Sequence, residues 1–492
     1  MKIALVSPAP SQIGKSVYVY ESSGGMPPLG LLYVAGSLVE EGHEVLVIDQ
    51  AAEGLTNKAV AEKVLQANAS VLGISALTSS ALRAAEITRL AKKANPSIHT
   101  VMGNVHATFC ADRILAKYPH VDLCVRGEGE EAIVDVVQAL ERDGYGQLKR
   151  VKGITLRNRA GRIVATANRP LIKDLDALPM PDRSLLSQDY HIKIGEIALR
   201  RGKFTTVVSS RGCPFVCTFC CCHVLCNRQW RARSPANIAD ELELLESQGY
   251  DHFLFADDSF TVNPKRAVKL AHLMRKRRIE MDWIIEGRVD AASREMFQEM
   301  VRAGCRLAFF GMESGTQRVL DIYRKKTTPR LNRLAAANAR AAGVDIIVGS
   351  FILGGPTETF REMQITTDFA KHCDIDFAQF NILGLSPGAP LWEEAIAKGY
   401  INPELYWESG VLAANVFPDS PPLKRIRDIA RDAFMDFSLR PHYLVKELFL
   451  TLSSPFRIKA ILSSVSSLPH WVNLRRLYKY VVPPTEEGNE SS

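Results

Sequence analysis

The first part of the chain, about 140 residues, alternates between short apolar runs and amphipathic segments. The apolar runs are too uniformly hydrophobic for a half-exposed antiparallel sheet, so they indicate parallel strands covered by helices on both faces. The predicted strands are Ile3–Ser7, Glu44–Ile48, Val71–Ser75, Thr100–Met102 and Leu123–Val125, and the predicted helices are Leu29–Glu41, Lys58–Asn68, Leu82–Ala94, Ala107–Lys117 and Glu131–Arg142. The pattern predicts a Rossmann-like, doubly wound α/β domain that binds ligands at the carboxyl ends of its strands.

A second series of β/α units begins near residue 204. Its predicted strands are Thr205–Ser209, His252–Phe255, Met281–Glu286, Leu307–Gly311, Asp345–Phe351 and Ala378–Leu383, with helices such as Ile238–Glu246, Lys265–Lys276 and Arg294–Ala303. Six such units predict a partial (β/α)6 barrel whose active site lies at the carboxyl ends of the strands, as in a complete barrel.

The segments around these two series have a different character. A hairpin is predicted from Val151–Arg157 and Arg162–Ala165, and the proline-rich passage Leu178–Asp182 suits an extended connection. Beyond residue 420 the pattern is helical, with candidates at Arg425–Ser438 and Tyr443–Leu452. The sequence therefore predicts four parts, namely residues 1–145, a linker at 146–200, the barrel at 201–400 and a helical region at 401–492 that caps the substrate site.

Length and composition exclude several classes of protein. A chain of 492 residues, 46% hydrophobic and 23% charged, indicates a globular protein of two or three domains rather than a disordered or fibrous one. A net charge of +7 permits an anionic ligand or a membrane surface without requiring nucleic acid, so no nucleic-acid partner is predicted. The N-terminus has too short an apolar run for a signal peptide, and no stretch of about 18 apolar residues is present, so we expect a cytoplasmic location.

Five of the ten cysteines lie close together, from Cys213 to Cys222. Three of them form a C-x3-C-x2-C motif directly after the first predicted barrel strand: Cys213, Cys217 and Cys220. Three thiolates can hold three irons of a [4Fe–4S] cluster and leave the fourth iron open to a ligand. A structural zinc site is the alternative, and it would need a fourth ligand such as His223 or Cys226.

This motif, with the aromatic Phe219 just before its last cysteine, resembles that of the radical S-adenosylmethionine (SAM) superfamily over residues 204–400. The resemblance implies that SAM binds the open iron and is cleaved to a 5′-deoxyadenosyl radical. It also implies that residues at successive strand ends bind SAM: Phe219, Asp257, Asp258, Arg288, Glu313, Ser314 and Gly354.

Residues 1–140 resemble the cobalamin-binding domain that precedes the barrel in one large class of these enzymes. The resemblance implies that strand ends bind cobalamin through Ser75, Leu77, Thr78, Gly103, His106, Gly127 and Glu128. Asn104 departs from the Gly-Gly pair that the family usually has at this point, and the Asp-x-His-x-x-Gly motif is absent after the first strand, so no histidine ligand to cobalt is expected there. A flavodoxin-like domain without its ligand is the alternative, and His106 suits either a corrin contact or a buried loop histidine.

Together these resemblances predict a cobalamin-dependent radical SAM C-methyltransferase. Two SAM molecules are consumed in each turnover, one for the radical and one to remethylate cobalamin. The alternatives are an anaerobic cyclase or oxidoreductase that uses the same cofactors, as in formation of the fifth ring of bacteriochlorophyll, and a non-enzymatic sensor.

The expected partners are a small-molecule or lipid substrate and a reductant such as flavodoxin or ferredoxin. The helical region, whose basic residues include Arg457 and Lys459, favours a hydrophobic or anionic substrate such as a polycyclic lipid or a tetrapyrrole. The same region is either a solvated helical cap or an amphipathic edge that contacts anionic lipid at the inner face of a membrane.

Overall fold

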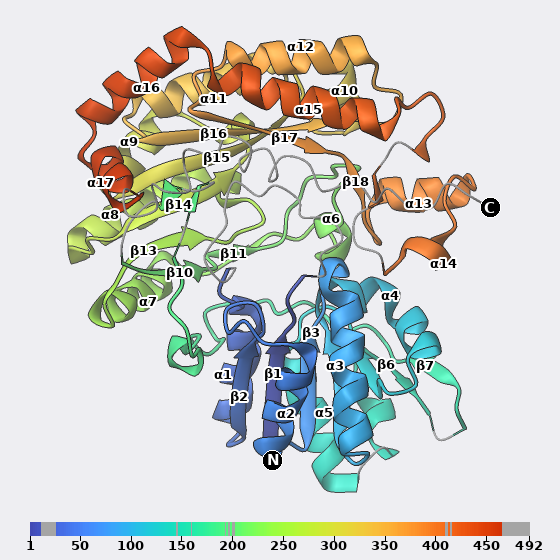
Figure 1. The fold of residues 1–492 in the computed structure, drawn as a ribbon. Coiled ribbons are helices and arrows are strands. Elements are labelled where there is room, and N and C mark those ends of the chain that lie inside the picture. The colour runs from blue at the N-terminus through green and yellow to red at the C-terminus, as the bar shows by residue number, and fades with distance from the viewer. Residues whose placement is uncertain are drawn as a thin grey trace.

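Two parallel β-sheets form the framework of the protein (Figure 1). The computed structural model describes residues 1–492 except 11–25, 144–145, 159, 192, 195–196, 199–201, 409–411, 414–415 and 465–492. The carboxyl ends of the first five strands of the first sheet face the second unit (Figure 1). Both predicted series of β/α units are confirmed.

The first sheet has the order β2-β1-β3-β4-β5-β6-β7, and its first five strands are parallel. The strands are β1 Lys2–Ser7, β2 Glu44–Asp49, β3 Val71–Ser75, β4 His99–Gly103, β5 Leu123–Val125, β6 Ile154–Arg157 and β7 Ile163–Ala165. The helices are α1 Leu29–Glu40, α2 Asn57–Gln66, α3 Ala81–Ala94, α4 Asn104–Lys117 and α5 Glu130–Asp143. Helices α1 and α5 share one core with the sheet, and α2, α3 and α4 share another, so both faces are covered. This strand order is that of a flavodoxin-like doubly wound sheet, with its switch point between β1 and β3.

The predicted hairpin within residues 146–200 is part of the first sheet. Strand β6 pairs antiparallel with β5, and β7 pairs antiparallel with β6. The extended connection to the barrel therefore begins only after β7. The bounds proposed for the four parts stay a prediction.

The second sheet is a six-stranded, fully parallel partial barrel with the order β10-β13-β14-β15-β16-β17. Its strands are β10 Lys203–Val207, β13 Tyr250–Phe255, β14 Asp282–Gly287, β15 Cys305–Glu313, β16 Ile346–Leu353 and β17 Phe377–Ile382. Its helices are α7 Pro235–Ser247, α8 Pro264–Arg277, α9 Arg294–Arg302, α10 Gln317–Ile322, α11 Pro329–Ala341 and α12 Phe360–Lys371. The short elements are β8 Lys193–Ile194, β9 Ile197–Ala198, β11 Ser210–Arg211, α6 Cys222–Leu225, β12 Arg231–Ala232, β18 Gly384–Leu385 and β19 Leu412–Ala413.

The interior of the barrel is closed at the amino ends of its strands. One apolar layer fills this end, consisting of Phe204, Leu254, Ile284, Leu307, Ile346 and Val348, with Tyr190 and Phe456 packed against it. Because side chains alternate along a strand, the residues two positions further on point into the same interior. These are Thr206, Ala256, Glu286, Phe309 and Ser350, so a more polar layer lies above the apolar floor.

The C-terminal helices are α13 Pro390–Ala397, α14 Pro403–Tyr406, α15 Leu423–Ser438, α16 Pro441–Ser453 and α17 Pro455–Ser464. Helices α16 and α17 lie at the amino ends of the barrel strands, since Arg457 bonds to Asp345 and Asp376, which directly precede β16 and β17. This is the end opposite to the predicted substrate site, so these two helices do not cap it. Residues 384–407 lie at the carboxyl ends instead, where Leu391 donates its backbone N–H to Thr218.

One hydrophobic core joins the two units. Residues of α3 and α4 pack with Tyr323, Trp392 and Trp407 from the barrel side. Gly388 lies directly against the ring of Phe109 on α4, at a φ of +85°. The first sheet is thereby fixed to the segment that follows the last barrel strand.

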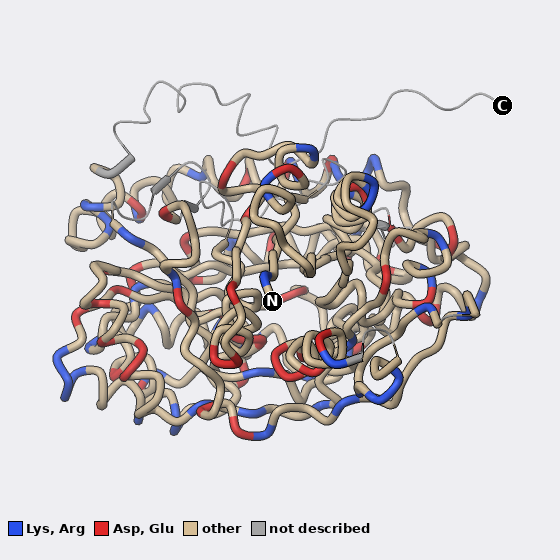
Figure 2. Tube along the Cα trace, turned by 90° about the horizontal axis from the view of Figure 1, so that it is seen from below, with Lys and Arg blue, Asp and Glu red and all other residues tan. Residues whose placement is uncertain are grey.

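Charged residues of both signs are distributed around the outline of the described chain (Figure 2). Among the described residues, no helix is both long enough and apolar enough to cross a bilayer.

We expect Gly388→Ala to destabilise the junction between the two units by about 3 kcal/mol, because the new Cβ would lie 2.6 Å from the Phe109 ring and the backbone conformation disfavours a side chain. Gly399→Ala is the matched control, since its φ is +71° but its Cβ would meet nothing within 4 Å. Urea denaturation followed by tryptophan fluorescence measures both. Equal midpoints for the two variants would show that Phe109 does not constrain this position.

Candidate active site

The cysteine motif lies in a loop that begins at Gly212, a position where only glycine fits. Gly212 has a φ of +87°, and a Cβ there would lie 2.1 Å from the carbonyl oxygen of Gln229. Its N–H donates to the Asp258 carboxylate at 2.7 Å. The loop therefore leaves the first barrel strand in a fixed direction, held by a side chain at the end of the neighbouring strand.

Two further cysteines support the motif without belonging to it. The backbone N–H of Cys213 lies 3.3 Å from the Cys226 sulfur, and the backbone N–H of Cys222 lies 3.4 Å from the Cys220 sulfur. Burial raises the pKa of the Cys220 thiol to about 12. In the part of the chain that the structure describes, no three His, Cys, Asp or Glu side chains surround one point where a single metal ion could bind. Three thiolates that each bind a different iron of a cluster do not need such a point, whereas a zinc site does.

Two buried cations flank the cysteine motif. The Arg288 guanidinium stacks 3.6 Å from the Phe215 ring centroid and lies 3.9 Å from the Cys217 sulfur. It also donates to the backbone carbonyl of Lys325, whose ammonium binds Glu313 at 2.5 Å. Burial raises the pKa of the Cys217 thiol, and the charges of Lys325 and Arg288 oppose that rise. Arg288 also binds the Asp290 carboxylate at 2.9 Å, so both cations beside the cysteine loop have a carboxylate partner.

Two carboxylates lie together at the carboxyl ends of β13 and β14. Asp258 follows β13 and is exposed, and Glu286 points into the barrel interior above Ile284. Burial, and then the charge of Asp258, raise the pKa of Glu286 to about 7. The carboxylates of Asp258 and Glu286 are two hydrogen-bond acceptors beside the cysteine loop, and together they can bind an ammonium group.

The side chains of the other predicted SAM-binding residues make different kinds of contact. Asp257 is buried and accepts three hydrogen bonds from Ser209 and Ser210 at 2.6–2.7 Å, so it stabilises the first strand end. Burial raises its pKa. Ser314 is likewise buried, and its hydroxyl lies 3.0 Å from that of Thr366 on α12. Neither side chain is turned toward the cysteine loop.

Glu313 and Gly354 lie at the ends of β15 and β16. Glu313 has a φ of +61°, and its carboxylate is neutralised by Lys325. The Gly354 N–H donates to Glu358 at 2.8 Å, and burial raises the pKa of Glu358 to about 7. Phe219 is half-buried, with its ring edge-on to Tyr323 at 5.3 Å between centroids.

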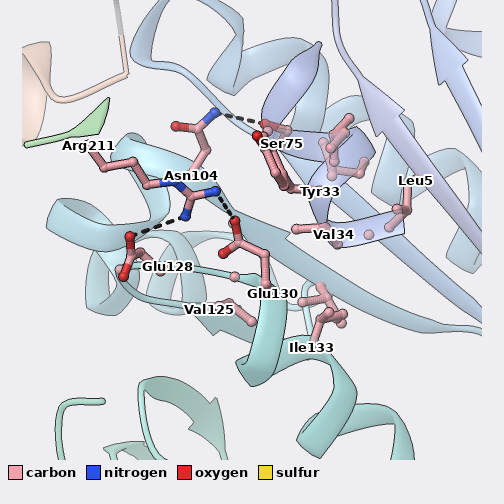
Figure 3. Close-up of a pocket in the computed structure, with 18 of the residues that line it drawn as sticks. Leu5, Tyr33, Val34, Ser75, Asn104, Val125, Glu128, Glu130, Ile133 and Arg211 are labelled. Carbon is pink, nitrogen blue, oxygen red and sulfur yellow. Dashed lines mark hydrogen bonds and ion pairs between the residues drawn. The ribbon is translucent and has the colours of Figure 1, made fainter. Parts of the chain in front are cut away.

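A cavity of about 260 Å³ lies at the carboxyl ends of the first sheet (Figure 3). Its wall is largely apolar, with Leu5, Leu31, Val34, Ile74, Val101, Val125 and Ile133. Three glycines of the wall leave open space, since a Cβ at Gly30, Gly103 or Gly127 would meet nothing within 4 Å. Of the residues predicted to bind cobalamin, the cavity is lined by Ser75, Gly103, Gly127 and Glu128.

The conformation of Asn104 shows why an asparagine can stand where the family usually has a Gly-Gly pair. Its φ is +76°, a conformation that glycine adopts freely and that asparagine tolerates better than most residues. Its side-chain amide donates to the Ser75 hydroxyl at 2.8 Å (Figure 3). The asparagine thus keeps the backbone shape and ties the ends of β3 and β4 together.

Arg211 connects the cavity with the cysteine loop. It precedes Cys213 by two residues, yet its guanidinium lines the cavity and binds Glu128 at 3.2 Å and Glu130 at 2.6 Å (Figure 3). It also stacks over the Tyr33 ring at 5.0 Å. Burial opposes ionisation of Glu128, but hydrogen bonds from Arg231 and the Ile172 N–H, with the charge of Arg211, hold its pKa below the usual value. Glu128 therefore stays ionised at neutral pH.

Three residues predicted to bind cobalamin do not line this cavity. Leu77 is exposed at the end of β3. His106 is buried, stacks on Trp407 at 5.6 Å between ring centroids, and has its Nδ1 3.2 Å from the Thr78 hydroxyl. Burial lowers the pKa of His106 to about 4, so its ring is neutral. The position of His106 favours the interpretation that it is a buried loop histidine.

The sequence analysis did not identify the residues whose side chains connect different helices, strands and loops. Arg211, Tyr33 and Lys325 each occupy an unremarkable position in the sequence, and no spacing rule marks them. The absent Asp-x-His-x-x-Gly motif concerns the loop after β1, which from residue 11 lies outside the described residues.

Two family models match separate parts of the chain. A B12 binding domain matches residues 15–137, and the radical SAM superfamily matches residues 207–370. An uncharacterised methyltransferase of Pyrococcus horikoshii is 34% identical over 91% of this chain and 95% of its own length. An anaerobic magnesium-protoporphyrin IX monomethyl ester cyclase of Rubrivivax gelatinosus is 30% identical over 76% of this chain and 67% of its own length.

Among solved structures, the radical SAM methyltransferase TsrM of Kitasatospora setae, with cobalamin and a [4Fe–4S] cluster bound, has the same fold. Its TM-score is 0.64 at 16% identity, over 81% of this chain and 75% of that chain. The protein therefore belongs to the cobalamin-dependent radical SAM methyltransferase family, which has cyclase relatives. It is an enzyme, and its cofactors are a [4Fe–4S] cluster, SAM and cobalamin.

The residues present fit these cofactors. The glycine-walled cavity at the switch point of the first sheet has room for the flat base and ribose of an extended cobalamin tail. The exposed Leu77 beside it offers an apolar surface to the corrin. The cysteine loop with Arg288, Asp258 and Glu286 around it offers thiolates to iron, a cation to a carboxylate and acceptors to an ammonium group.

We expect Asp258→Asn and Glu286→Gln each to weaken SAM binding about tenfold, because each removes a charged acceptor at the end of the barrel. With the pKa of Glu286 near 7, SAM affinity should rise as the pH increases through neutrality and its carboxyl loses a proton. Glu286→Gln should remove that rise. Anaerobic equilibrium dialysis measures the affinities.

Asp257→Asn is the control for these variants. It should lower the unfolding temperature, since Asp257 accepts three buried hydrogen bonds, without a selective effect on SAM. Wild-type affinity in both Asp258→Asn and Glu286→Gln would contradict the ammonium site.

We expect Gly103→Val to abolish cobalamin binding while preserving the fold. Gly103 has φ −133° and ψ −169°, which suit a β-branched residue, so the new side chain fills the cavity without backbone strain. Ala94→Val, which adds side-chain volume on the exposed end of α3, is the control. Cobalamin is measured by its absorbance after gel filtration, and the iron content should be unchanged in both variants. Full cobalamin uptake by Gly103→Val would show that the cavity is not its site.

Proposed function

We propose that this enzyme is a C-methyltransferase, which transfers a methyl group to an unactivated carbon of a small molecule. The observation that carries this proposal is Arg211, which lines the cavity of the first sheet although it lies only two residues before Cys213. The places offered to the two metal cofactors are therefore adjacent. A substrate carbon held between them can be reached from both sides.

When bound, the cofactors supply the chemistry, namely a 5′-deoxyadenosyl radical from SAM and a methyl group from cobalamin. The chain's own residues bind, orient and shield. Cys213, Cys217 and Cys220 would hold the cluster, and Arg288 beside it would donate hydrogen bonds to the SAM carboxylate. Ser75, Gly103, Gly127 and Glu128 form the wall for the cobalamin tail.

The barrel interior supports a substrate with both apolar and polar parts. Phe204, Leu254 and their neighbours pack together at its floor, which shields the interior from water at the amino ends of the strands. Above the floor, the Asn381 amide donates to the Ser350 hydroxyl at 3.0 Å, and Gln379 donates to Asn381 at 3.0 Å. These groups can bind a polar substituent of an otherwise hydrophobic or anionic molecule, such as a polycyclic lipid or a tetrapyrrole.

An anaerobic cyclase or oxidoreductase that uses the same cofactors is the second candidate. It is favoured by the relative of Rubrivivax gelatinosus, which carries the cyclase name and shares 30% identity. Both candidates need a one-electron reductant such as flavodoxin or ferredoxin. They differ in whether the product gains a carbon atom.

The methyl transfer is tested with SAM labelled in its methyl group. Cell extract of a deletion strain is incubated anaerobically with the reconstituted enzyme, dithionite and CD3-SAM, and the products are analysed by mass spectrometry. A methyltransferase should give a product that carries the CD3 group. A product lighter by hydrogen atoms, with no label, would favour the cyclase or oxidoreductase.

The triple variant in which Cys213, Cys217 and Cys220 are all replaced by Ala should lose the iron–sulfur absorbance and all cleavage of SAM, because no thiolates remain to hold the irons. Cys305→Ala is the matched control, since Cys305 is buried in the core beneath the barrel. Cleavage of SAM by the triple variant at the wild-type rate would contradict the assignment.

A further inference from the structure

Helices α16 and α17 expose an unusual number of large apolar side chains. The members of this apolar face are Leu444, Val445, Leu448, Phe449 and Leu452 on α16, Ile458, Ile461 and Leu462 on α17, and Leu439 just before α16. Phe449 is 69% exposed and Leu452 is 66% exposed. Single exposed leucines are ordinary on a protein surface, whereas a contiguous group marks a contact with another body.

The spacing of these residues places them on one side of each helix. The five members on α16 follow the pattern i, i+1, i+4, i+5 and i+8, which keeps them on one continuous stripe. The opposite side of α16 is used for packing. Tyr443 is buried and donates its hydroxyl to the carbonyl of Asp376, and Lys446 binds Asp374 at 2.6 Å.

Within α16 and α17 the exposed charge beside the apolar face is basic, although Asp432 and Asp436 at the end of α15 are also exposed. The sole acidic residue of α16 is Glu447, and it is turned inward to Arg457 at 2.7 Å. From Leu448 to Thr485 the sequence contains no Asp or Glu. Lys459 is exposed on α17 beside the face. The following stretch of sequence, whose structure lies outside the described residues, contains Trp471, Arg475, Arg476, Tyr478, Lys479 and Tyr480.

Apolar, basic and aromatic residues together are the composition of surfaces that enter the headgroup region of a bilayer. A soluble partner protein would more often meet a surface with charges of both signs around its apolar centre. This composition favours an anionic lipid membrane over a soluble partner protein.

The position of the face permits such docking during catalysis. Arg457 and Phe456 of α17 close the amino ends of the barrel strands, and the cysteine loop lies at their carboxyl ends. Figure 1 shows α16 and α17 at one side of the barrel, away from the first sheet. A membrane on this side would leave the mouth of the barrel open.

We propose that the apolar face of α16 and α17 docks the enzyme on anionic phospholipid bilayers. The side chains of Leu448, Phe449 and Leu452 enter the apolar region below the headgroups, and Lys459 lies against the phosphates. Docking is peripheral and reversible, and it weakens as salt screens the headgroup charge.

The test is co-sedimentation of the full-length holoenzyme with vesicles of phosphatidylcholine, with and without phosphatidylglycerol. We expect binding to the vesicles that contain phosphatidylglycerol, and a loss of at least about tenfold in Leu448→Glu/Phe449→Glu. Leu405→Glu is the matched control, since Leu405 is an equally exposed leucine on α14. All variants should keep the cluster absorbance and SAM cleavage of the wild type, which shows that they fold.

Four outcomes would overturn the proposal. The first is no vesicle binding by the wild type. The second is equal binding by the double variant. The third is a wild-type dimer that sediments as a monomer only in the double variant, which would make a second copy the occupant of the face. Protection of α16 from hydrogen exchange in the absence of vesicles, lost in the double variant, would identify residues 465–482 as the cover and would also overturn it.

Discussion

The ion pairs of Arg211 are the interaction on which the relative arrangement of the cavity and the cysteine loop depends. The residue belongs to the barrel by sequence and to the wall of the first sheet's cavity by position, bound to Glu128 and Glu130. A charge buried in this way is costly unless it is paired, so breaking the pairs is expected to be more damaging than their net contribution suggests. The pairing fixes the distance between the cavity and the cysteine loop, which loop flexibility would otherwise leave undefined.

Hydrophobic packing at a second place also fixes the position of the first sheet relative to the barrel. The core that includes Trp392 and Trp407 covers α3 and α4, and Gly388 allows the chain to pass directly over Phe109. His106 belongs to this packing, which explains why a histidine near the predicted cobalamin site contributes its ring to an interface. The two parallel sheets are thus held at two separated points, one polar and one apolar.

The sequence predicted the strands of both sheets and the cysteine loop because local pattern alone determines them. Uniform apolar runs indicate that a strand is buried on both faces, and the C-x3-C-x2-C spacing by itself indicates the three predicted cluster ligands. It could not distinguish Asp257 from Asp258, since adjacent residues at a strand end point to opposite sides, and only the neighbouring Ser209 and Ser210 decide which one is buried. Lys325 stands in a basic stretch that resembles a solvated surface, and its pairing with Glu313 depends on the fold. The placement of α16 and α17 at the amino ends of the barrel likewise follows from Asp345 and Asp376, which no helical pattern could reveal.

The apolar floor of the barrel has a consequence for the order of events. Phe204, Leu254, Ile284 and Tyr190 pack together at the amino ends of the strands, so among the described residues the mouth beside the cysteine loop is the favoured route into the interior. A ligand at the loop is therefore covered by whatever binds after it. In the proposed reaction SAM would therefore bind before the substrate, and the product would leave before the nucleoside and methionine formed from SAM.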